Sequence, residues 1–296
     1  MTGSPQPDAA YRPSLVPACR QAGLTADGAR LLRVHANAIY HLPAENAVVR
    51  IRNAAALDRM RIAVKTAAWL ADQGYPAVRP LKMTQPIVVG PNIATFWEYL
   101  PPGDGRRPET KDLAQLLRDL HQHPLPPFPL SPIRPLGYTA DEARISTVLS
   151  EHERNWLIDR CSELEEAFAR LTANLPSVIV HGDGHTNNVI PHPTLGWALI
   201  DWDSVGTGPP HYDFMPTYLR PRRFGYPETT WRSFAIAYGI DPADENHLQL
   251  LAQIREIRSL SAFVRGAQHN PAAHAELNNR LSSLMTEDRT RIWHAL

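Results

Sequence analysis

Polar side chains gather in the stretch from Val178 to Ser204, which reads VIVHGDGHTNNVIPHPTLGWALIDWDS. One apolar run, 178–180, leads into the loop HGDGHTNN, and a second, 197–200, leads into IDWD. Glycines on both sides of Asp183 favour a loop over a helix, because glycine adopts backbone conformations that helices do not use. We therefore expect two short strands that deliver four polar side chains to one place: Asp183, Asn188, Asp201 and Asp203.

Three carboxylates and one amide form a set of hard oxygen donors, which magnesium accepts while keeping waters and substrate phosphates as its other ligands. A zinc pair formed by His181 and His185 would require a continuous helix to place both rings on one face, and the glycines interrupt such a helix. The spacing instead suits a hairpin with its turn at 192–196. The stretch predicts a divalent ion and a phosphorylated substrate.

The motif His181-Gly182-Asp183 with Asn188 five residues past the aspartate, followed by Ile200-Asp201-Trp202-Asp203, resembles the paired motifs of the aminoglycoside phosphotransferase and choline kinase-like family. This resemblance implies a protein-kinase fold. It also implies transfer of the terminal phosphoryl group of ATP or GTP to a small-molecule hydroxyl.

By the same resemblance, Asp183 is the catalytic aspartate that orients the accepting hydroxyl, and Asn188 and Asp201 hold Mg²⁺. Kinases use a loop Asp, a loop Asn and a second Asp in these roles. Asp203 is expected either as a ligand of a second metal ion or as an acceptor outside the ligand set. His181 and Asp213 are expected to support the loop, with Asp213 bonding to its backbone.

The N-terminal segments 29–35, 37–42 and 47–52 predict a small antiparallel sheet. In the family, the turn between the first two strands covers the nucleotide phosphates. Here that turn is His35-Ala36-Asn37 and has no glycine, so Asn37 is a nucleotide-binding candidate and an ordinary hairpin turn is the alternative. On the third strand, Arg50 takes the place of the phosphate-binding basic residue. Arg52 shares its face, because side chains on one face of a strand recur every second residue.

Two further features bear on nucleotide binding. A helix with an apolar stripe from Met60 to Ala71 follows the third strand but lacks the glutamate with which the family's helix pairs the basic strand residue. Glu98 and Tyr99 then resemble the hinge whose backbone groups bond the nucleobase. Of thirty basic residues only three are lysines, so an arginine in the phosphate-binding position fits the composition.

The rest of the chain predicts mainly helices, with amphipathic patterns at 111–123, 154–173 and 272–285 and an apolar stripe along 250–264. The proline-rich run 123–135 predicts an extended connector. We therefore expect an α+β fold, a bilobal protein-kinase-like architecture. Residues 1–100 would form a small nucleotide-binding lobe with an antiparallel sheet and one helix. Residues 101–296 would form a larger, mainly helical catalytic and acceptor-binding lobe.

Composition narrows the partners. Thirty basic residues balance thirty acidic ones in 296, which argues against a nucleic acid or an anionic membrane. The two cysteines, Cys19 and Cys161, do not suggest a disulfide framework, and no segment has the length of a signal peptide core or a membrane span. We expect a cytoplasmic monomer or homodimer that binds a nucleotide and a small-molecule hydroxyl acceptor.

The leading hypothesis is a magnesium-dependent O-phosphotransferase that acts on an antibiotic, an amino alcohol or a sugar. The arginines Arg220, Arg222 and Arg223 follow Asp213 closely and favour a neutral or weakly charged acceptor. Two alternatives stay open. A non-catalytic nucleotide- or ligand-binding relative is suggested by the glycine-free turn and the missing glutamate, and a metal-dependent hydrolase could use the same carboxylates. Antibiotic resistance and primary metabolism are both compatible with these residues.

Overall fold

The computed structural model describes residues 8–34, 37–244 and 246–295. The chain forms two compact units. The first consists of Met1–Pro108, Pro126–Phe128 and Asn187–Val205, and the second of Glu109–Leu125, Pro129–Thr186 and Gly206–Leu296. The boundary expected at residue 100 remains a prediction.

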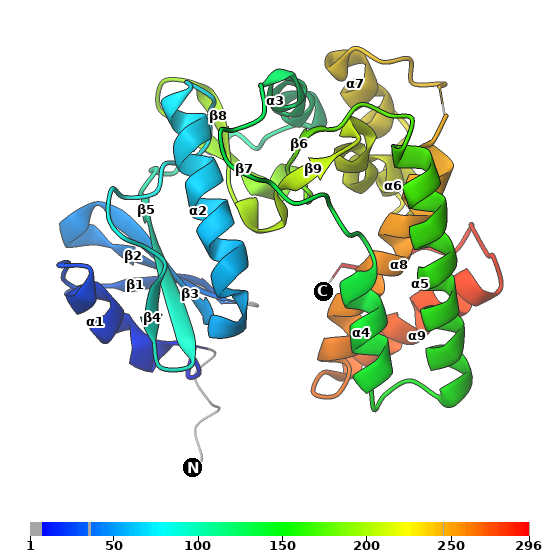
Figure 1. Cartoon of the computed structure of the whole chain (residues 1–296), viewed down its shortest axis with the longest axis horizontal. Coiled ribbons are helices and arrows are strands. Elements are labelled where there is room, and N and C mark those ends of the chain that lie inside the picture. Colours follow the sequence, from blue (N-terminus) through cyan, green and yellow to red (C-terminus); the bar gives the residue numbers. More distant parts are fainter. Residues whose placement is uncertain (1–7, 35–36, 245, 296) are drawn as a thin grey trace. The chain divides into compact units, whose positions relative to one another are not determined.

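An antiparallel sheet is the centre of the first unit (Figure 1). Its strands follow the order β1-β2-β3-β5-β4, and each pairs antiparallel with its neighbours. The sequence patterns predicted the first three strands. Two residues of the expected phosphate-covering turn, His35 and Ala36, lie outside the described residues. The strand bounds are β1 Arg30–Val34, β2 Ala38–Leu42, β3 Ala47–Asn53, β4 Ile87–Val89 and β5 Asn92–Glu98.

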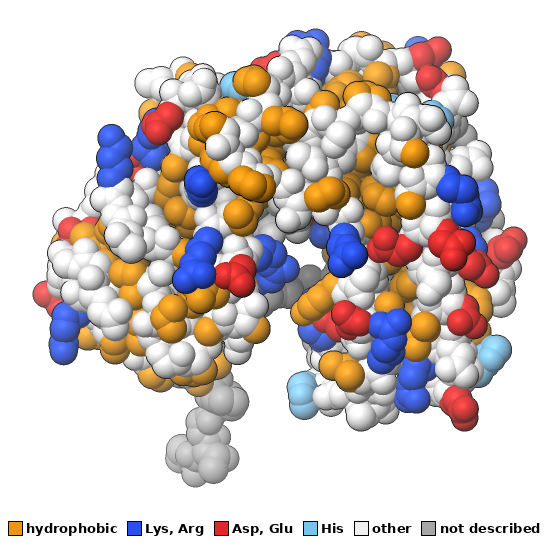
Figure 2. All heavy atoms as spheres, viewed as in Figure 1, with side chains coloured by type: hydrophobic (Ala, Val, Ile, Leu, Met, Phe, Trp, Pro, Cys, Tyr) orange, Lys and Arg blue, Asp and Glu red, His pale blue; other side chains and the backbone are white. Residues whose placement is uncertain are grey.

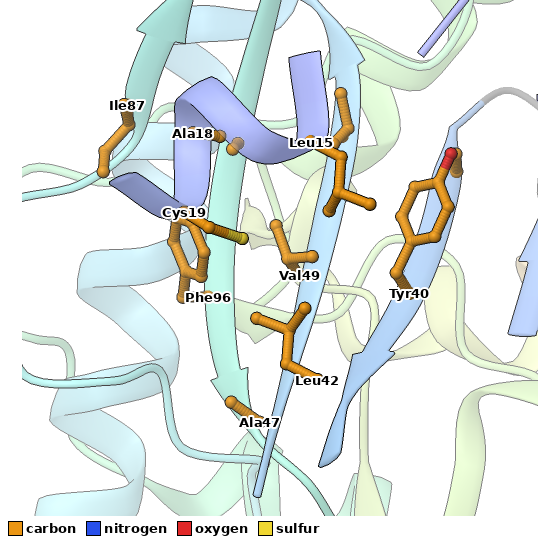
Figure 3. Packing of buried hydrophobic residues seen from close by; sticks show 12 residues of the cluster. Leu15, Ala18, Cys19, Tyr40, Leu42, Ala47, Val49, Ile87 and Phe96 are labelled. Atoms are coloured by element: carbon orange, nitrogen blue, oxygen red, sulfur yellow. The ribbon is translucent and has the colours of Figure 1, made fainter. Parts of the chain in front are cut away.

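Alternation along β3 assigns its two faces. Ala47, Val49 and Ile51 are fully buried in an apolar cluster, whereas Arg50 and Arg52, at the alternate positions, point to the other side of the sheet. Helix α1, Arg12–Gln21, covers the apolar face with Leu15, Ala18 and Cys19 (Figure 3). The sequence predicted one helix in the N-terminal part of the chain, and α1 is a second one. The proline inside it, Pro17, and its short apolar stripe obscure it in the sequence.

Helix α2, Leu57–Asp72, follows β3 and carries the apolar stripe that predicted it. The hairpin of β7, Val189–His192, and β8, Gly196–Leu199, also belongs to the first unit and confirms the predicted strand, turn and strand. Leu199 bonds the backbone of the segment after α2, donating to Pro76 at 2.8 Å and accepting from Val78 at 3.2 Å. The short helix Trp202–Ser204 packs against α2. The IDWD motif is thereby attached to the sheet unit.

The second unit is mainly helical (Figure 1). Two of its helices begin with reciprocal capping boxes, Glu109 with Asp112 and Ser150 with Glu153, which satisfy N–H groups that a helix start leaves unpaired. The strands β6, Val178–Val180, and β9, Gly206–Gly208, pair antiparallel within this unit. Its helices are α3 Thr110–Gln122, α4 Gly137–Ile145, α5 Glu151–Thr172, α6 Met215–Arg223, α7 Thr229–Tyr238, α8 Leu248–Gly266 and α9 Pro271–Met285.

Basic and acidic side chains are interspersed on the face shown in Figure 2, in keeping with the balanced charge of the sequence. Within the described ranges, every helix is too short or too polar to cross a bilayer.

The strand β9 packs so closely on the segment 131–133 that glycine is required. A Cβ added at Gly206 would lie 2.7 Å from the backbone oxygen of Ser131. We expect Gly206→Ala to lower the free energy of unfolding by about 1–3 kcal/mol, the usual cost of overpacking. Gly137→Ala is the control, because Gly137 begins α4 with nothing within 4 Å of its added Cβ. Urea unfolding should show that variant equal to or slightly more stable than the parent, and equal stability of both variants would contradict the steric argument.

Candidate functional site

The loop after β6 carries Asp183, and hydrogen bonds to the side chain of Asp213 hold its backbone in place. The Asp213 carboxylate is fully buried and accepts two backbone hydrogen bonds, from His181 N–H and from Gly182 N–H, each at 2.7 Å. Gly182 has φ of +79°, a conformation that glycine adopts without strain and that turns the chain toward Asp183. The His181 ring is buried, and its Nδ1 accepts from the Asp183 N–H at 3.3 Å. The loop backbone is therefore rigidly positioned.

His121 of α3 completes this support, and sequence patterns did not indicate it. Its Nε2 lies 3.1 Å from Asp213 Oδ2, and its Nδ1 lies 2.8 Å from the Tyr238 hydroxyl on α7. Gly184 is closely packed as well, because an added Cβ would lie 3.1 Å from a Leu117 methyl group of α3. Side chains of α3 and α7 thus support the loop, through His121 and Leu117 of α3 and through Tyr238 of α7.

The Asp183 carboxylate faces two arginines of α8. Arg255 Nη2 donates to Asp183 Oδ1 at 2.7 Å, and Arg258 Nη1 donates to the Gly182 carbonyl at 3.0 Å and to the Tyr212 hydroxyl. His185 Nε2 lies 3.5 Å from the other oxygen of Asp183. Burial opposes ionisation of Asp183, but the charge of Arg255 and the contact with His185 outweigh it and hold its pKa well below the usual range. Asp183 is ionised at every physiological pH.

In the first unit, two arginines and two aspartates form a second cluster. Arg50 binds Asp203 through two bonds, Nη1 to Oδ1 at 2.7 Å and Nη2 to Oδ2 at 2.8 Å, and its Nη1 also reaches Asp201 Oδ1 at 3.1 Å. Arg52 Nη1 donates to Asp203 Oδ2 as well. The sequence predicted that both arginines lie on one face of β3, but not that Asp203 joins them.

Asn37 extends this cluster to β2. With its carboxamide oriented so that the oxygen faces the guanidinium, Asn37 accepts from Arg50 Nη2 at 2.8 Å and from Nε at 3.1 Å. Every nitrogen of the Arg50 guanidinium therefore has an acceptor within this unit. Because α2 has no glutamate, the carboxylate that pairs with Arg50 comes from Asp203 instead of from this helix.

Asp201 is held in a backbone conformation that few residues adopt. Its φ of +66° and ψ of +58° lie in the left-handed region, where a residue with a Cβ is strained. The preceding Ile200 N–H donates to the backbone oxygen of Asn188 at 3.0 Å, which ties the two candidate metal-binding segments together. Asn188 is buried, whereas the Asp201 side chain is 37 % exposed. Strain of this kind is common where a side chain must be aimed at a ligand.

A magnesium site from these residues fits the donor chemistry. Over the described ranges there is no group of three or more His, Cys, Asp and Glu side chains that could enclose a metal ion. Magnesium does not need one, since it takes one or two carboxylates together with waters and substrate phosphates. Asp201 and Asn188 supply such a partial set. The metal roles of Asn188, Asp201 and Asp203 remain predictions.

Burial opposes ionisation of Asp203, but Arg50 and Arg52 outweigh it and lower its pKa. Both of its carboxylate oxygens accept from guanidinium groups, so in this conformation they bind arginines. This arrangement favours Asp203 as the residue that positions Arg50.

Glu98, the first residue of the expected hinge, is the last residue of β5, and Tyr99 follows it. The Glu98 N–H donates to the Arg79 oxygen at 2.9 Å, and the Tyr99 N–H donates to the Asn46 oxygen at 3.2 Å. The Tyr99 ring stacks on His41 at 3.9 Å between centroids. Both amide donors are thus engaged by the protein, and a nucleobase role for these residues remains a prediction.

Arg255 and Arg258 were also missed from the sequence. The sequence gives one indication of their role. They lie three residues apart on α8, whose apolar stripe was predicted, so both project from the same side of that helix. Nothing in the local sequence says that this side meets Asp183.

Comparison with known proteins supports the fold. The sequence model described as the phosphotransferase enzyme family matches residues 29–257. No curated protein matches in a direct sequence comparison. Among solved structures, many resemble this chain, and three represent them.

The aminoglycoside phosphotransferase APH(3″)-Id from Streptomyces rimosus, in complex with ADP and streptomycin, has a TM-score of 0.60 at 19% identity, over 82% of this chain and 97% of that one. A choline/ethanolamine kinase family protein from Mesorhizobium loti has a TM-score of 0.63 at 16% identity, over 93% and 92%. The GDP and kanamycin complex of APH(2″)-IIIa has a TM-score of 0.63 at 13% identity, over 94% and 99%. The expected kinase-like fold is confirmed.

The paired geometry of Asp203 makes it important for stability. Its side chain is 15 % exposed and that of Arg50 11 %, so we expect Asp203→Asn to lower the free energy of unfolding at pH 7 by about 3 kcal/mol, as when one partner of a buried ion pair is removed. Asp58→Asn is the control, because Asp58 is 92 % exposed beside Arg61, and it should change stability by less than about 0.5 kcal/mol. Equal urea midpoints for the two variants would contradict this.

The same pair should show an acid dependence. A folded-state pKa below the unfolded value, about 3.9 for Asp, stabilises the protein above that value, and this contribution is lost as the pH falls through the folded pKa. The difference in unfolding free energy between wild type and Asp203→Asn should therefore be constant from pH 8 to 5 and shrink below about pH 4.

Proposed function

Since the chain belongs to the phosphotransferase enzyme family, we propose that it transfers the γ-phosphoryl group of ATP or GTP to a hydroxyl group of a small molecule, with Mg²⁺ as the metal ion. The observation that carries this proposal is the cluster of Arg50, Asp201 and Asp203. It holds a cationic strand residue beside the carboxylate that follows β8. Phosphoryl transfer needs such charge placement more than covalent chemistry.

On this proposal, Arg50 steadies the α and β phosphates, and Asp203 and Asn37 orient its planar fork. Arginine is suited to this task, because its donors match phosphate geometry in pairs. All nitrogens of Arg50 are engaged by the protein, so phosphate must replace one contact. The 3.1 Å bond to Asp201 is the longest of those to the carboxylates and is the one we expect to open.

Asn188 and Asp201 would hold the magnesium ion, which supplies charge neutralisation to the phosphates when it is bound. The left-handed backbone at Asp201 and the hydrogen bond between Ile200 and Asn188 keep these two donors in place. Asp203, with both oxygens on arginines, is assigned to the support of Arg50.

Asp183 would accept a hydrogen bond from the acceptor hydroxyl and so orient its oxygen for attack. A carboxyl group with a strongly lowered pKa is a weak base. Orientation is therefore its main contribution, and Asp213 and His121 act by keeping its loop fixed.

A binding protein without turnover is the second candidate. The observation that favours it is the full engagement of Arg50 within the protein, which must be partly undone before phosphate can bind. The two candidates share nucleotide binding and differ in turnover, so variants of Asp201 and Asp183 separate them.

The donor site can be tested by calorimetry with ATP and GTP, each with and without Mg²⁺. We expect magnesium-dependent binding of at least one nucleotide, and Asp201→Asn should reduce that affinity by about 10- to 100-fold, the loss typical of a charge-assisted contact. Asparagine tolerates the left-handed backbone at this position, so strain does not confuse the result. Asp58→Asn should bind as wild type does. Absence of nucleotide binding to the wild type would rule out both candidates.

Asp183→Asn should keep nucleotide affinity and lose turnover by a factor of about 10²–10⁴, the contribution expected of a residue that positions or takes a proton. The measurement is the rate of nucleoside diphosphate release, with each acceptor molecule that the wild-type protein phosphorylates. Asp141→Asn, at a residue 72 % exposed on α4, is the matched control. Wild-type turnover in Asp183→Asn would refute its catalytic role.

A further inference from the structure

Arginines surround the loop that carries Asp183. Arg255 binds the Asp183 carboxylate at 2.7 Å, and Arg258 binds the carbonyl of the preceding residue, Gly182, at 3.0 Å. Two guanidinium groups thus lie beside the one carboxylate that the proposed function places at the acceptor hydroxyl. The other carboxylate of this loop's surroundings, Asp213, is engaged by two backbone N–H groups and His121.

Arg255 has hydrogen-bonding capacity left over. Its Nη2 is used by Asp183, whereas its Nε and Nη1 donate to no acceptor among the residues that the structure describes. The side chain is 21 % exposed, so solvent or a ligand can reach it. A guanidinium with one edge occupied and another available is suited to a second planar or tetrahedral anion.

Arg220 of α6 adds a cation at the far end of the same loop. Its Nη2 donates to Thr186 Oγ1 at 2.7 Å, and its guanidinium lies 5.1 Å from the centroid of the Tyr226 ring. No carboxylate in the described part of the chain lies within ion-pair distance of it. Burial lowers its pKa, as expected for a charge without a counterion.

The carboxylates that contact this loop are already committed. Asp213 is shared by two backbone N–H groups and His121, and Asp183 by Arg255 and His185. An amine on the acceptor would find a guanidinium next to the Asp183 carboxylate and no uncommitted carboxylate on this loop. Like charges so placed repel.

We propose that the acceptor molecule carries a carboxylate or phosphate group in addition to its hydroxyl, and that Arg255 binds this anion while Asp183 orients the hydroxyl. This inference rests on the proposed function and names its substrate class. It replaces the neutral or weakly charged acceptor that the sequence suggested. In the reaction, the bond between the γ-phosphorus and the β-γ bridging oxygen breaks, and a bond from the acceptor oxygen to that phosphorus forms. The hydroxyl proton is released, and the nucleoside diphosphate leaves with the bridging oxygen.

A different role for Arg255 would be to hold Asp183 in place and nothing more. The two roles differ in their dependence on acceptor charge. If Arg255 only positions Asp183, its removal slows all acceptors equally. If it binds the acceptor's anion, its removal affects anionic acceptors most.

The test begins with matched acceptors that differ in charge: glycerate and glycerol 3-phosphate against glycerol, and choline and ethanolamine as cations. A wider panel of hydroxy acids and sugar phosphates, each beside its uncharged parent, extends the comparison. With the nucleotide that calorimetry identifies, we expect diphosphate release for anionic acceptors with a kcat/KM about 10- to 100-fold above that for their neutral partners, as charge-assisted bonds provide. Comparison of glycerate with glycerol 3-phosphate shows whether the protein prefers a carboxylate or a phosphate on the acceptor.

Three variants then locate the effect. Arg255→Gln should raise KM for the anionic acceptor by about 10- to 100-fold and change the neutral partner much less. Arg255→Lys should recover part of the loss, because it keeps the charge without the fork. Arg232→Gln removes an exposed arginine of α7 and should leave both acceptors unchanged.

The outcomes separate this inference from the proposed function. Efficient phosphorylation of choline or ethanolamine, or an equal loss for charged and neutral acceptors in Arg255→Gln, would overturn the anionic acceptor while leaving the phosphotransferase in place. Turnover confined to neutral or cationic alcohols would also overturn it. Nucleotide binding without turnover of any alcohol would instead favour the binding protein and so count against the proposed function. Failure of nucleotide binding itself would instead count against the proposed function.

Discussion

The contact of a guanidinium with a carboxylate governs both groups of candidate residues. In the first unit Arg50 clasps Asp203 through two bonds, and in the second Arg255 binds Asp183 through one. Removing such groups from water costs free energy, and the cost is repaid when the geometry is good and the remaining donors are satisfied. Arg50 meets this condition fully, whereas Arg255 meets it in part. The first arrangement is closed and the second is open, which is why a ligand is inferred at the second.

The substitution of arginine for lysine reaches further than one strand. A lysine at position 50 would be a compact charge that one carboxylate could hold. A planar fork needs acceptors on two edges, and Asp203 and Asn37 supply them from outside that helix. The absence of a helix glutamate is thus matched by a new partner, and a cationic residue remains positioned on β3.

Features that depend on neighbouring residues in the sequence were predictable from the sequence. The alternation of β3 placed Arg50 and Arg52 on one face, and the glycines beside Asp183 predicted its loop. Contacts between residues distant in sequence were not predictable in this way. Asp203 meets Arg50 because the segment after β8 packs on α2, and Arg255 meets Asp183 because α8 passes the loop, 72 residues later in the chain. Helix α1 was not predicted because it is short, has a narrow apolar face and contains Pro17 in its interior.

The residue at position 50 also determines which reagents can report on this protein. A nucleotide analogue with a reactive acyl group at its phosphates would label a site by acylating a neighbouring lysine amine, which is a nucleophile when unprotonated. A guanidinium is not deprotonated in proteins, and Arg50 is in addition bound to two carboxylates. Such reagents have no amine to acylate at this position, so a survey of nucleotide-binding proteins that counts labelled lysines there would pass over this chain.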